Sequence, residues 1–219
     1  MIQLSNVNFK YNNSSSGALC DISLDIHKGE CVLLCGDSGC GKTTVTRLIN
    51  GLIPHFYEGE LTGSVRVCGM NVPEEEIYTV SRKVGSVFQN PRSQFFCLDT
   101  SSELAFGCEN LGMPVEQINE RVKHAVRELE LENLLDRDIF KLSGGEKQRI
   151  ACGSVSAMFP DIIVLDEPTS NLDKESIELL KHILALWKKQ NKTIIIAEHR
   201  LYWLKDICDR AIYLSNGKI

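Results

Sequence analysis

The stretch that decides the fold is Gly36-Asp37-Ser38-Gly39-Cys40-Gly41-Lys42-Thr43, which fits the pattern G-x-x-x-x-G-K-[ST]. An apolar run at 31–35, typical of a buried strand, precedes it, and a helical pattern at 42–50, ended by Gly51, follows it. Glycines in such a turn let backbone N–H groups converge on phosphate oxygens, and the helix start adds about half a positive charge. The stretch is therefore predicted to be a phosphate-binding loop and not an ordinary glycine-rich turn.

This loop and a second motif supply the chemistry of a nucleoside triphosphate site. Lys42 is expected to reach the β- and γ-phosphates, and the Thr43 hydroxyl to ligate Mg²⁺. The aliphatic run at 162–165 predicts another buried strand, which ends in Asp166 and Glu167. Asp166 is expected to hold the magnesium, directly or through water, and Glu167 to polarise the attacking water. The nucleotide-binding residues predicted in the loop are Gly36, Asp37, Ser38, Gly39, Cys40, Gly41, Lys42, Thr43 and Thr44.

Length and composition favour a single globular unit. The chain has 219 residues, of which 43% are hydrophobic and 24% charged, the balance of a soluble domain with or without an inserted subdomain. No apolar run approaches the roughly 18–20 residues of a spanning helix, and residues 1–11 do not form a secretory signal. The net charge of -5 disfavours a broad basic face, so we expect no nucleic-acid partner.

The nine cysteines show no C-x-x-C motif and no paired metal-ligand spacing. Cys31 and Cys35 would share one face of a strand, so we interpret them as small core residues and not as zinc ligands. An odd number of cysteines without a secretory signal favours the reducing cytosol. Cys40 lies near a helix start and Lys42, which favour a thiolate, and we hypothesise a reactive thiol that bound nucleotide protects.

Strand patterns alternate with helix patterns along the chain, which predicts a βαβ arrangement with a parallel sheet. Further strands are predicted at 84–88, 193–197 and 211–214. After 211–214, Asn216-Gly217 is a strong hairpin signal, yet only two residues follow it. We therefore expect the chain to be truncated at its C-terminus, or to be one part of a longer polypeptide.

A helical insert is predicted between residues 90 and 141. Thr100-Ser101-Ser102-Glu103 has the pattern of a capping box and is expected to open a helix that ends near Gly112. Pro114 is expected at the first position of a second helix. The apolar face of that second helix is predicted to comprise Val115, Ile118, Val122, Ala125, Val126 and Leu129.

A third motif narrows the choice among phosphate-loop proteins. Leu142-Ser143-Gly144-Gly145-Glu146-Lys147-Gln148-Arg149 resembles the signature motif of the ABC ATPase family. Ser143, Gly144 and Gly145 precede a helix whose free N–H groups can bind a γ-phosphate. The resemblance implies that this motif faces the nucleotide of the opposite subunit. Glu146 stands where the family usually has Gln, and Glu is a familiar variant in its importer branch.

Further positions match the family in its order along the whole chain. Tyr11, in Val7-Asn8-Phe9-Lys10-Tyr11, resembles the aromatic residue that stacks on adenine. Gln89 resembles the Q-loop glutamine, expected at the catalytic and metal site, and His199 the switch histidine that contacts the γ-phosphate. Asp173, in Ser170-Asn171-Leu172-Asp173, resembles the D-loop aspartate and is also a plausible helix cap.

The resemblance implies an α/β fold: a P-loop NTPase core with a mostly parallel sheet, an N-terminal antiparallel β subdomain and an inserted α-helical subdomain. Residues 1–219 would form one ABC ATPase domain. Residues 1–89 and 159–219 would be the nucleotide-binding core, and 90–158 the helical subdomain with the signature motif. Glu167, His199, Gln89 and Lys42 would be catalytic, with ATP and Mg²⁺ as ligands.

The Q-loop region Phe88-Gln89-Asn90-Pro91-Arg92-Ser93-Gln94-Phe95-Phe96 is similar to that of energy-coupling-factor (ECF) importers, which serve vitamins and transition-metal ions. In the Q-loop region, members of that branch more often carry an acidic residue where Arg92 stands. The segment Gly51-Leu52-Ile53-Pro54-His55-Phe56-Tyr57-Glu58-Gly59 also resembles that branch. Phe95 and Phe96 are either core residues or part of a groove for a partner's coupling helix. Shorter matches are Leu104-Ala105-Phe106-Gly107 and Ala197-Glu198-His199-Arg200.

The family implies two domains, identical or related, that close head to tail around two ATP molecules and are opened by hydrolysis. The ECF branch implies a transmembrane coupling subunit, a substrate-binding membrane subunit and a place on the cytoplasmic face of the cell membrane. The alternative is a soluble ABC ATPase acting on ribosomes or DNA, for which the short insert and negative charge are unfavourable. A catalytically dead, regulatory domain ranks lower, because every expected catalytic position is filled.

Overall fold

A parallel five-stranded sheet forms the centre of the molecule. The structure is a computed structural model that describes residues 1–14 and 17–219. The strand order is β6-β7-β8-β3-β9, and every neighbouring pair is parallel. The apolar runs predicted as buried strands are confirmed, because aliphatic side chains of these strands fill cores on both faces. The strands are β3 (Cys31–Cys35), β6 (Val84–Val87), β7 (Ile162–Asp166), β8 (Thr193–Ala197) and β9 (Arg210–Tyr213).

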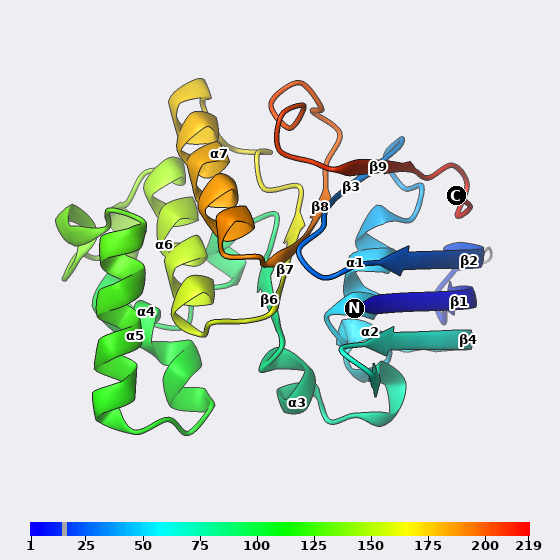
Figure 1. The fold of residues 1–219 in the computed structure, drawn as a ribbon, viewed down its shortest axis with the longest axis horizontal. Helices are drawn as coiled ribbons and strands as arrows, with labels where there is room; N and C mark the ends of the chain where they lie inside the picture. The colour runs from blue at the N-terminus through cyan, green and yellow to red at the C-terminus, as the bar shows by residue number, and fades with distance from the viewer. Residues whose placement is uncertain (15–16) are drawn as a thin grey trace.

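The carboxyl edge of this sheet gathers the loops that carry the motifs. Helix α1 (Lys42–Ile49) follows β3, and α7 (Lys174–Lys189) connects β7 to β8 (Figure 1). Asp166 at the end of β7 pairs with Ala197 at the end of β8, and Leu34 of β3 pairs with the same Ala197. Ligands of open parallel sheets bind outside the carboxyl ends of the strands, so this edge is the expected place for a site.

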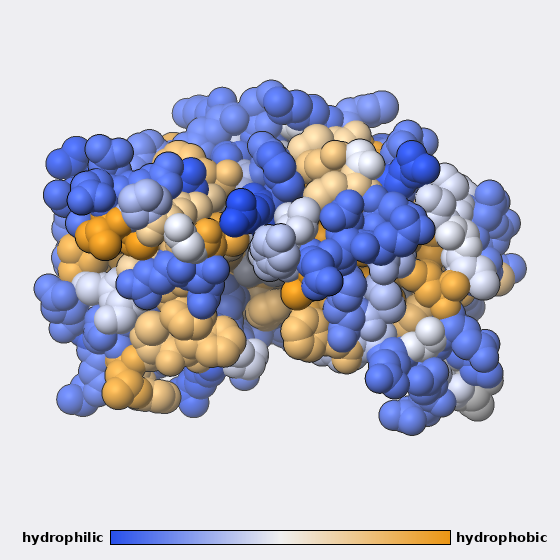
Figure 2. Space-filling view, turned by 90° about the horizontal axis from the view of Figure 1, so that it is seen from below, coloured by the Kyte–Doolittle hydropathy of each residue, from blue (hydrophilic) through white to orange (hydrophobic). Residues whose placement is uncertain are grey.

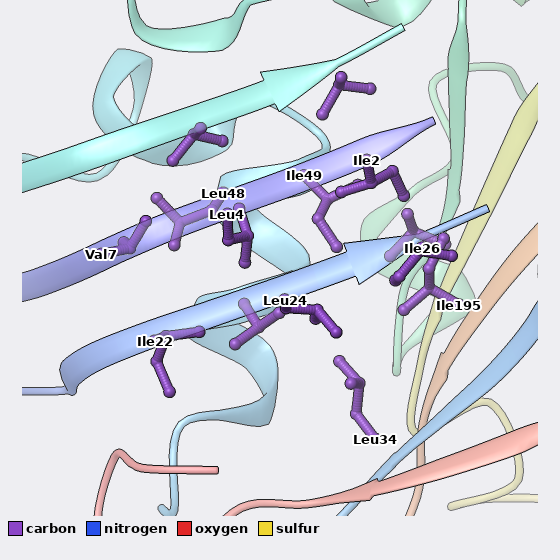
Figure 3. Close-up of a cluster of buried hydrophobic side chains, with 14 of the residues drawn as sticks. Ile2, Leu4, Val7, Ile22, Leu24, Ile26, Leu34, Leu48, Ile49 and Ile195 are labelled. Atoms are coloured by element: carbon purple, nitrogen blue, oxygen red, sulfur yellow. The ribbon is translucent and has the colours of Figure 1, made fainter.

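A separate antiparallel sheet packs against α1, and together with α1 and one face of the parallel sheet it forms one hydrophobic core. Its order is β2-β1-β4-β5, and buried side chains alternate with exposed ones along β1 and β2 except where the register between them shifts. Figure 3 shows Leu4 of this sheet beside Leu48 of α1 and Ile2 beside Ile49, with Ile195 of the parallel sheet next to Ile26. This core fixes the helix that follows the phosphate loop. The strands are β1 (Ile2–Tyr11), β2 (Leu19–Ile26), β4 (Gly59–Val67) and β5 (Met70–Asn71).

Three helices pack together on the other side of the parallel sheet (Figure 1). They are α4 (Thr100–Asn110), α5 (Val115–Glu128) and α6 (Gly144–Ala157), and α6 also contacts α7 and β6. Of two short helices, α2 (Leu52–His55) contacts α1, and α3 (Ile77–Ser81) contacts β6 and lies below it in Figure 1. Single 3₁₀ turns are found at Val72–Glu74, Pro91–Ser93, Glu132–Leu134 and Ile139–Lys141.

The start of α4 differs from the prediction. Asp99, and not Thr100, caps the helix, because its carboxylate accepts a hydrogen bond from the Ser102 backbone N–H at 2.9 Å. Glu103 is buried and accepts hydrogen bonds from the backbone N–H groups of residues 96 and 97, both at 2.9 Å. The predicted capping box is therefore wrong, since the carboxylate that would complete it serves the preceding loop.

Helix α5 also begins one residue later than predicted. Pro114 occupies the N-cap and not the first helical position, and 67% of Val115 is exposed. Val115 therefore does not belong to the apolar face. The rest of the predicted stripe is confirmed, because its remaining residues, Ile118, Val122, Ala125, Val126 and Leu129, are buried or pack partly buried against the core.

The turn predicted near the end of the chain is present. Asn216 and Gly217 both have positive φ, at 49° and 75°, as a type I′ turn requires. Ser215 and Lys218 on either side form an antiparallel bridge. Cys31 and Cys35 are buried, which confirms them as core residues. Within residues 1–14 and 17–219, no helix has both the length and the apolar character needed to cross a membrane.

Candidate functional site

The phosphate loop runs from the end of β3 to the start of α1 and requires glycine at its two ends. Gly36 and Gly41 have φ values of 142° and 113°, in the region that favours glycine. A Cβ added to Gly36 would lie 2.1 Å from the Leu214 carbonyl oxygen, and one on Gly41 would lie 2.8 Å from a Leu19 methyl. The loop is therefore held tightly between β9 and β2, with its backbone at the start of α1.

The Lys42 ammonium bridges the loop from inside. Its Nζ donates hydrogen bonds to the carbonyl oxygens of Gly36 and Asp37, each at 2.9 Å, and the residue is 4% exposed. The Cys40 thiol lies 3.8 Å from the same Nζ, but Cys40 is buried in the core beneath the loop. The loop can therefore contact a ligand with its backbone and with the buried positive charge of Lys42, whereas the buried Cys40 thiol cannot reach a ligand.

Two oxygen-bearing side chains from different motifs meet beside the loop. The Thr43 hydroxyl donates a hydrogen bond to Asp166 Oδ1 at 3.0 Å. Burial raises the pKa of the Asp166 carboxyl above its usual value, and the Thr43 hydrogen bond partly opposes that rise. Hydroxyl and carboxylate oxygens are ligands that Mg²⁺ prefers, so this pair fits a magnesium ion.

Glu167, Gln89 and His199 converge next to this pair. The Gln89 amide donates to Glu167 Oε2 at 2.9 Å, and His199 Nδ1 lies 3.9 Å from the same oxygen. Glu167 has a φ of 43°, and its backbone N–H donates to the Ala197 carbonyl at 2.8 Å. Such strained backbone is common at functional sites, and here it directly follows β7, at the residue whose carboxylate contacts Gln89 and His199.

Two clefts flank the phosphate loop. One, of about 510 Å³, brings together the loop and the segments after β7 and β8; its lining includes Gly36, Ser38, Lys42, Glu167, His199 and Tyr213. The other, of about 810 Å³, lies on the Thr43 side; its lining includes Thr43, Arg47, Tyr57, Gln89, Asn90 and Asp166. Neither lining includes Ser143, Gly144 or Gly145.

The predicted adenine platform is tied to α1. The Tyr11 hydroxyl shares a hydrogen bond with the Thr44 hydroxyl at 3.1 Å and accepts one from the Arg47 guanidinium at 3.0 Å. The same guanidinium lies 3.8 Å from the centre of the Tyr57 ring. The sequence analysis assigned no role to Arg47 or Tyr57, because their contacts join segments that are not adjacent in the sequence.

The signature motif begins α6, as predicted, with its own capping box. Ser143 caps the helix and accepts from the Glu146 N–H at 3.2 Å, while the Glu146 carboxylate accepts from the Ser143 N–H at 2.8 Å. These bonds, above all the one from the Ser143 backbone, hold the pKa of Glu146 below its usual value, helped by Arg137 at 2.8 Å. A Cβ on Gly145 would lie 2.0 Å from the Ser176 hydroxyl oxygen.

Asp173 is the N-cap of α7, and its carboxylate accepts from the Ser176 N–H at 2.9 Å. The expected helix cap is therefore confirmed. Because Ser176 also lies against Gly145, the D-loop and the start of the signature helix are packed together. The structure thus forms two groups of motif residues, one around the phosphate loop and one at the starts of α6 and α7.

The two phenylalanines of the Q-loop region have different environments. Phe95 packs against the core, whereas Phe96 is 75% exposed and stacks on Phe106, with ring centres 4.9 Å apart. Phe96 belongs to a groove of about 300 Å³ whose lining includes Leu52, Ile77, Ser81, Phe88, Phe106 and Met158. Helix α3, which contributes Ile77 and Ser81, lies at the lower edge of Figure 1, the side on which Figure 2 shows hydrophobic surface on both sides of a hollow.

No role was predicted for Glu198 from the sequence. Glu198 follows β8 directly and is fully buried, as is Thr169, two residues after Glu167. The Thr169 hydroxyl donates to Glu198 Oε2 at 2.5 Å. A carboxylate at the end of a buried aliphatic strand was the available signal, because such a group needs compensating donors.

Comparison with known proteins places this geometry in a family. A family model described as ABC transporter matches residues 19–170. The chain is 58% identical over 219 residues to a putative ABC transporter ATP-binding protein of Treponema denticola, and 41% identical over 220 residues to one of Pyrococcus abyssi. The whole chain is covered in both, but it spans 45% of the Treponema protein and 79% of the Pyrococcus protein. The chain therefore covers less than half of the Treponema relative.

Solved structures agree. CbiO1 from Clostridium perfringens, described as part of the ABC transporter complex CbiONQ, superposes with a TM-score of 0.87 at 28% identity, over 99% of this chain and 85% of that chain. The ATP-binding cassette MJ0796, solved as a dimer in a post-hydrolysis state with ADP and Pi, gives 0.85 at 26% identity, over 100% and 96%. From the family match, the fold and the motif geometry together, this chain belongs to the ABC transporter family, as one of its ATP-binding, ATP-hydrolysing domains.

Proposed function

We propose that this chain is the motor of an importer that takes up a micronutrient, a vitamin or a transition-metal ion, through a membrane partner. In this proposal it works at the cytoplasmic face of the cell membrane, with a transmembrane coupling subunit and a substrate-binding membrane subunit. Residues 1–89 and 159–219 act as the nucleotide-binding core, and 90–158 as the helical subdomain that transmits the motion.

The nucleotide roles follow from the chemistry of the site. The backbone of 36–44 and the Lys42 ammonium hold the phosphates, and Tyr11 offers its ring to adenine. Thr43 and Asp166, with Gln89 near them, would hold Mg²⁺. When bound, Mg²⁺ supplies positive charge that neutralises phosphate oxygens. Glu167 orients the attacking water, and His199 meets the charge on the γ-phosphate.

A single observation carries the ATPase assignment: the Glu167 carboxylate lies within 3.9 Å of His199 and accepts a hydrogen bond from Gln89, at the cleft that Lys42 lines. The test is Glu167→Gln in the full-length protein. This variant should keep Mg²⁺-dependent ATP binding and release phosphate at least about a hundredfold more slowly, because the glutamine amide cannot accept a proton from the attacking water.

A matched control is Glu178→Gln, which makes the same chemical change at an exposed position of α7. Its phosphate release should equal that of the unchanged protein. Undiminished turnover in Glu167→Gln would contradict the assignment of Glu167, and an absence of Mg²⁺-dependent ATP affinity in the unchanged protein would overturn the proposed function itself.

A second copy of this chain, or a related cassette, would complete each nucleotide site. The support is geometric: Ser143, Gly144 and Gly145 lie at a helix start with no place in the linings of the two clefts beside the phosphate loop. A helix N-terminus attracts phosphate oxygens, so this one would face the γ-phosphate held by a neighbour, with Asp173 beside it. Formation of a dimer that needs ATP, seen with Glu167→Gln by light scattering, tests this arrangement.

The groove around Phe96 and Phe106 is the proposed contact with the membrane partner. It is apolar, lies next to the Q-loop, and is lined by elements of both the core and the helical segment. An amphipathic helix of a partner suits such a groove. The similarity to CbiO1, part of a CbiONQ transporter complex, supports the micronutrient branch.

The alternative is an ABC ATPase that acts on ribosomes or DNA. The net charge of -5 is unfavourable to a broad contact with a nucleic acid. Fractionation of cells separates the two functions: the importer motor should sediment with membranes and be released by Phe96→Asp, whereas sedimentation with ribosomes or DNA would support the alternative. The transported solute would then be sought by uptake assays.

A further inference from the structure

Glu198 joins the two segments that carry Glu167 and His199. It lies between the last residue of β8 and His199, and its side chain has no exposed surface. Its own backbone N–H donates to the Leu34 carbonyl at 3.0 Å, which fixes it beside β3. The carboxylate is therefore directed into the protein below the active-site edge.

Each oxygen of this carboxylate has partners from one segment. Oε1 accepts hydrogen bonds from the backbone N–H groups of His199 at 2.8 Å and Arg200 at 3.0 Å, and His199 Nδ1 lies 3.3 Å away. Oε2 accepts from the Thr169 hydroxyl at 2.5 Å. Arg200 in turn donates to the Thr169 carbonyl at 3.3 Å. The two segments are thus bonded to each other through buried groups.

A buried carboxylate is costly unless its environment compensates it. Among residues 1–14 and 17–219, the only basic side chain within ion-pair distance of this carboxylate is the imidazole of His199. The remaining compensation comes from neutral donors of the same two segments. All of these partners belong to the segments that follow β7 and β8, so the geometry of the carboxylate is tied to the geometry of those two segments.

We propose that Glu198 is a positioning residue for hydrolysis: it holds the His199 backbone and imidazole, and it links them through Thr169 to the segment that carries Glu167. This inference rests on the proposed ATPase function. Glu198 is buried away from the nucleotide cleft and acts only through His199 and Thr169. The half-exposed His199 side chain lines the cleft, and its Nδ1 is the nitrogen that lies 3.3 Å from Glu198 and 3.9 Å from Glu167.

The test is Glu198→Gln in the full-length protein, alone and combined with His199→Ala. Glutamine keeps the shape and an acceptor oxygen for the two backbone N–H groups, so the fold should persist, which a thermal melt checks. We expect kcat to fall about tenfold or more while the ATP dissociation constant changes by less than about twofold, because positioning affects the reaction and not the binding.

Two further variants separate positioning from folding. In the His199→Ala background, Glu198→Gln should cause a smaller loss of kcat than in the unchanged protein, because the part of its effect that passes through the imidazole is already absent, while the link through Thr169 remains. Thr169→Val removes the hydroxyl and should lower kcat, whereas Thr169→Ser keeps the hydroxyl and should restore it. The exposed Glu178→Gln serves again as the matched control.

Unchanged kcat in Glu198→Gln, or a full loss that persists in the His199→Ala background, would overturn the inference. These failures are distinct from failure of the proposed function. If Glu167→Gln abolishes phosphate release while Glu198→Gln does not, the ATPase assignment stands and only the role of Glu198 is refuted.

Discussion

The Thr43 hydroxyl donates a 3.0 Å hydrogen bond to the Asp166 carboxylate, although 123 positions separate them in the sequence. Burial raises the pKa of Asp166, so the charged form destabilises the protein when no cation is bound. Asp166→Asn should therefore stabilise the nucleotide-free protein by about 1 kcal/mol while abolishing Mg²⁺-dependent hydrolysis. Thermal unfolding without Mg²⁺ and phosphate release with Mg²⁺-ATP measure the two effects.

The same substitution has a signed pH dependence. A carboxyl whose pKa is higher in the folded than in the unfolded state binds more protons when folded, so stability falls as pH rises through that window. The advantage of Asp166→Asn should be smallest near pH 4 and grow toward neutral pH, where Asp166 is charged. The exposed Asp206→Asn is the control, and an advantage of Asp166→Asn independent of pH would refute the explanation.

The contact between Gln89 and Glu167 predicts a difference between two substitutions of Gln89. Gln89→Ala removes the 2.9 Å hydrogen bond and should slow hydrolysis about tenfold. Gln89→Glu would place a second carboxylate beside Glu167 and should slow it further, because like charges at that distance favour a protonated Glu167, which cannot act as a base. Single-turnover phosphate release gives both rates, and equal rates would argue against the contact.

Substitutions in the capping box of Ser143 and Glu146 should lower the stability of the protein, and the contribution of Glu146 should depend on pH. Ser143→Ala removes the cap of α6 and should cost about 1 kcal/mol in the free energy of unfolding. Glu146→Gln keeps an acceptor but removes the charge. The pKa of Glu146 is lowered in the folded protein, so its charged form stabilises the fold at any pH above the pKa that Glu146 has in the unfolded chain. This stabilisation is lost as the pH falls through the pKa of Glu146 in the folded protein.

Denaturant unfolding at neutral pH and at about pH 3 checks this sign. The unchanged protein should exceed Glu146→Gln in stability at neutral pH, and the two should converge in acid. A gap that widens in acid would contradict the assignment of the carboxylate to the Ser143 N–H.

Much of the architecture was predictable because its signals are local. The aliphatic runs of β3, β7 and β8 are buried on both faces, and the glycine spacing at Gly36 and Gly41 reflects backbone that only glycine adopts easily. Order along the chain then identified the residues that gather at the carboxyl edge of the sheet.

The errors and omissions arose where a contact outside the local pattern decided the outcome. Glu103 had the spacing of a capping residue, but the loop before α4 uses its carboxylate. Likewise, Glu198 and Thr169 are 29 residues apart in sequence, and no local pattern announces their contact. The packing of Gly145 against Ser176 was equally hidden, because it depends on how α6 meets α7.

The burial of Cys40 argues against the reactive thiol hypothesised from the sequence. Lys42 and the helix start are near, as expected, but Cys40 is only 6% exposed and its sulfur faces Gly36, where an added Cβ would lie 2.8 Å away. Thiolate character is not sufficient for reaction when reagents cannot reach the sulfur. Maleimide should therefore modify the exposed Cys20 in the folded protein and leave Cys40 unmodified, with or without ATP.

Mass spectrometry of the labelled peptides reads out each site, with urea-unfolded protein as the control in which both react. Rapid labelling of Cys40 in the folded protein, slowed by ATP, would instead show that the loop opens enough to restore the original hypothesis.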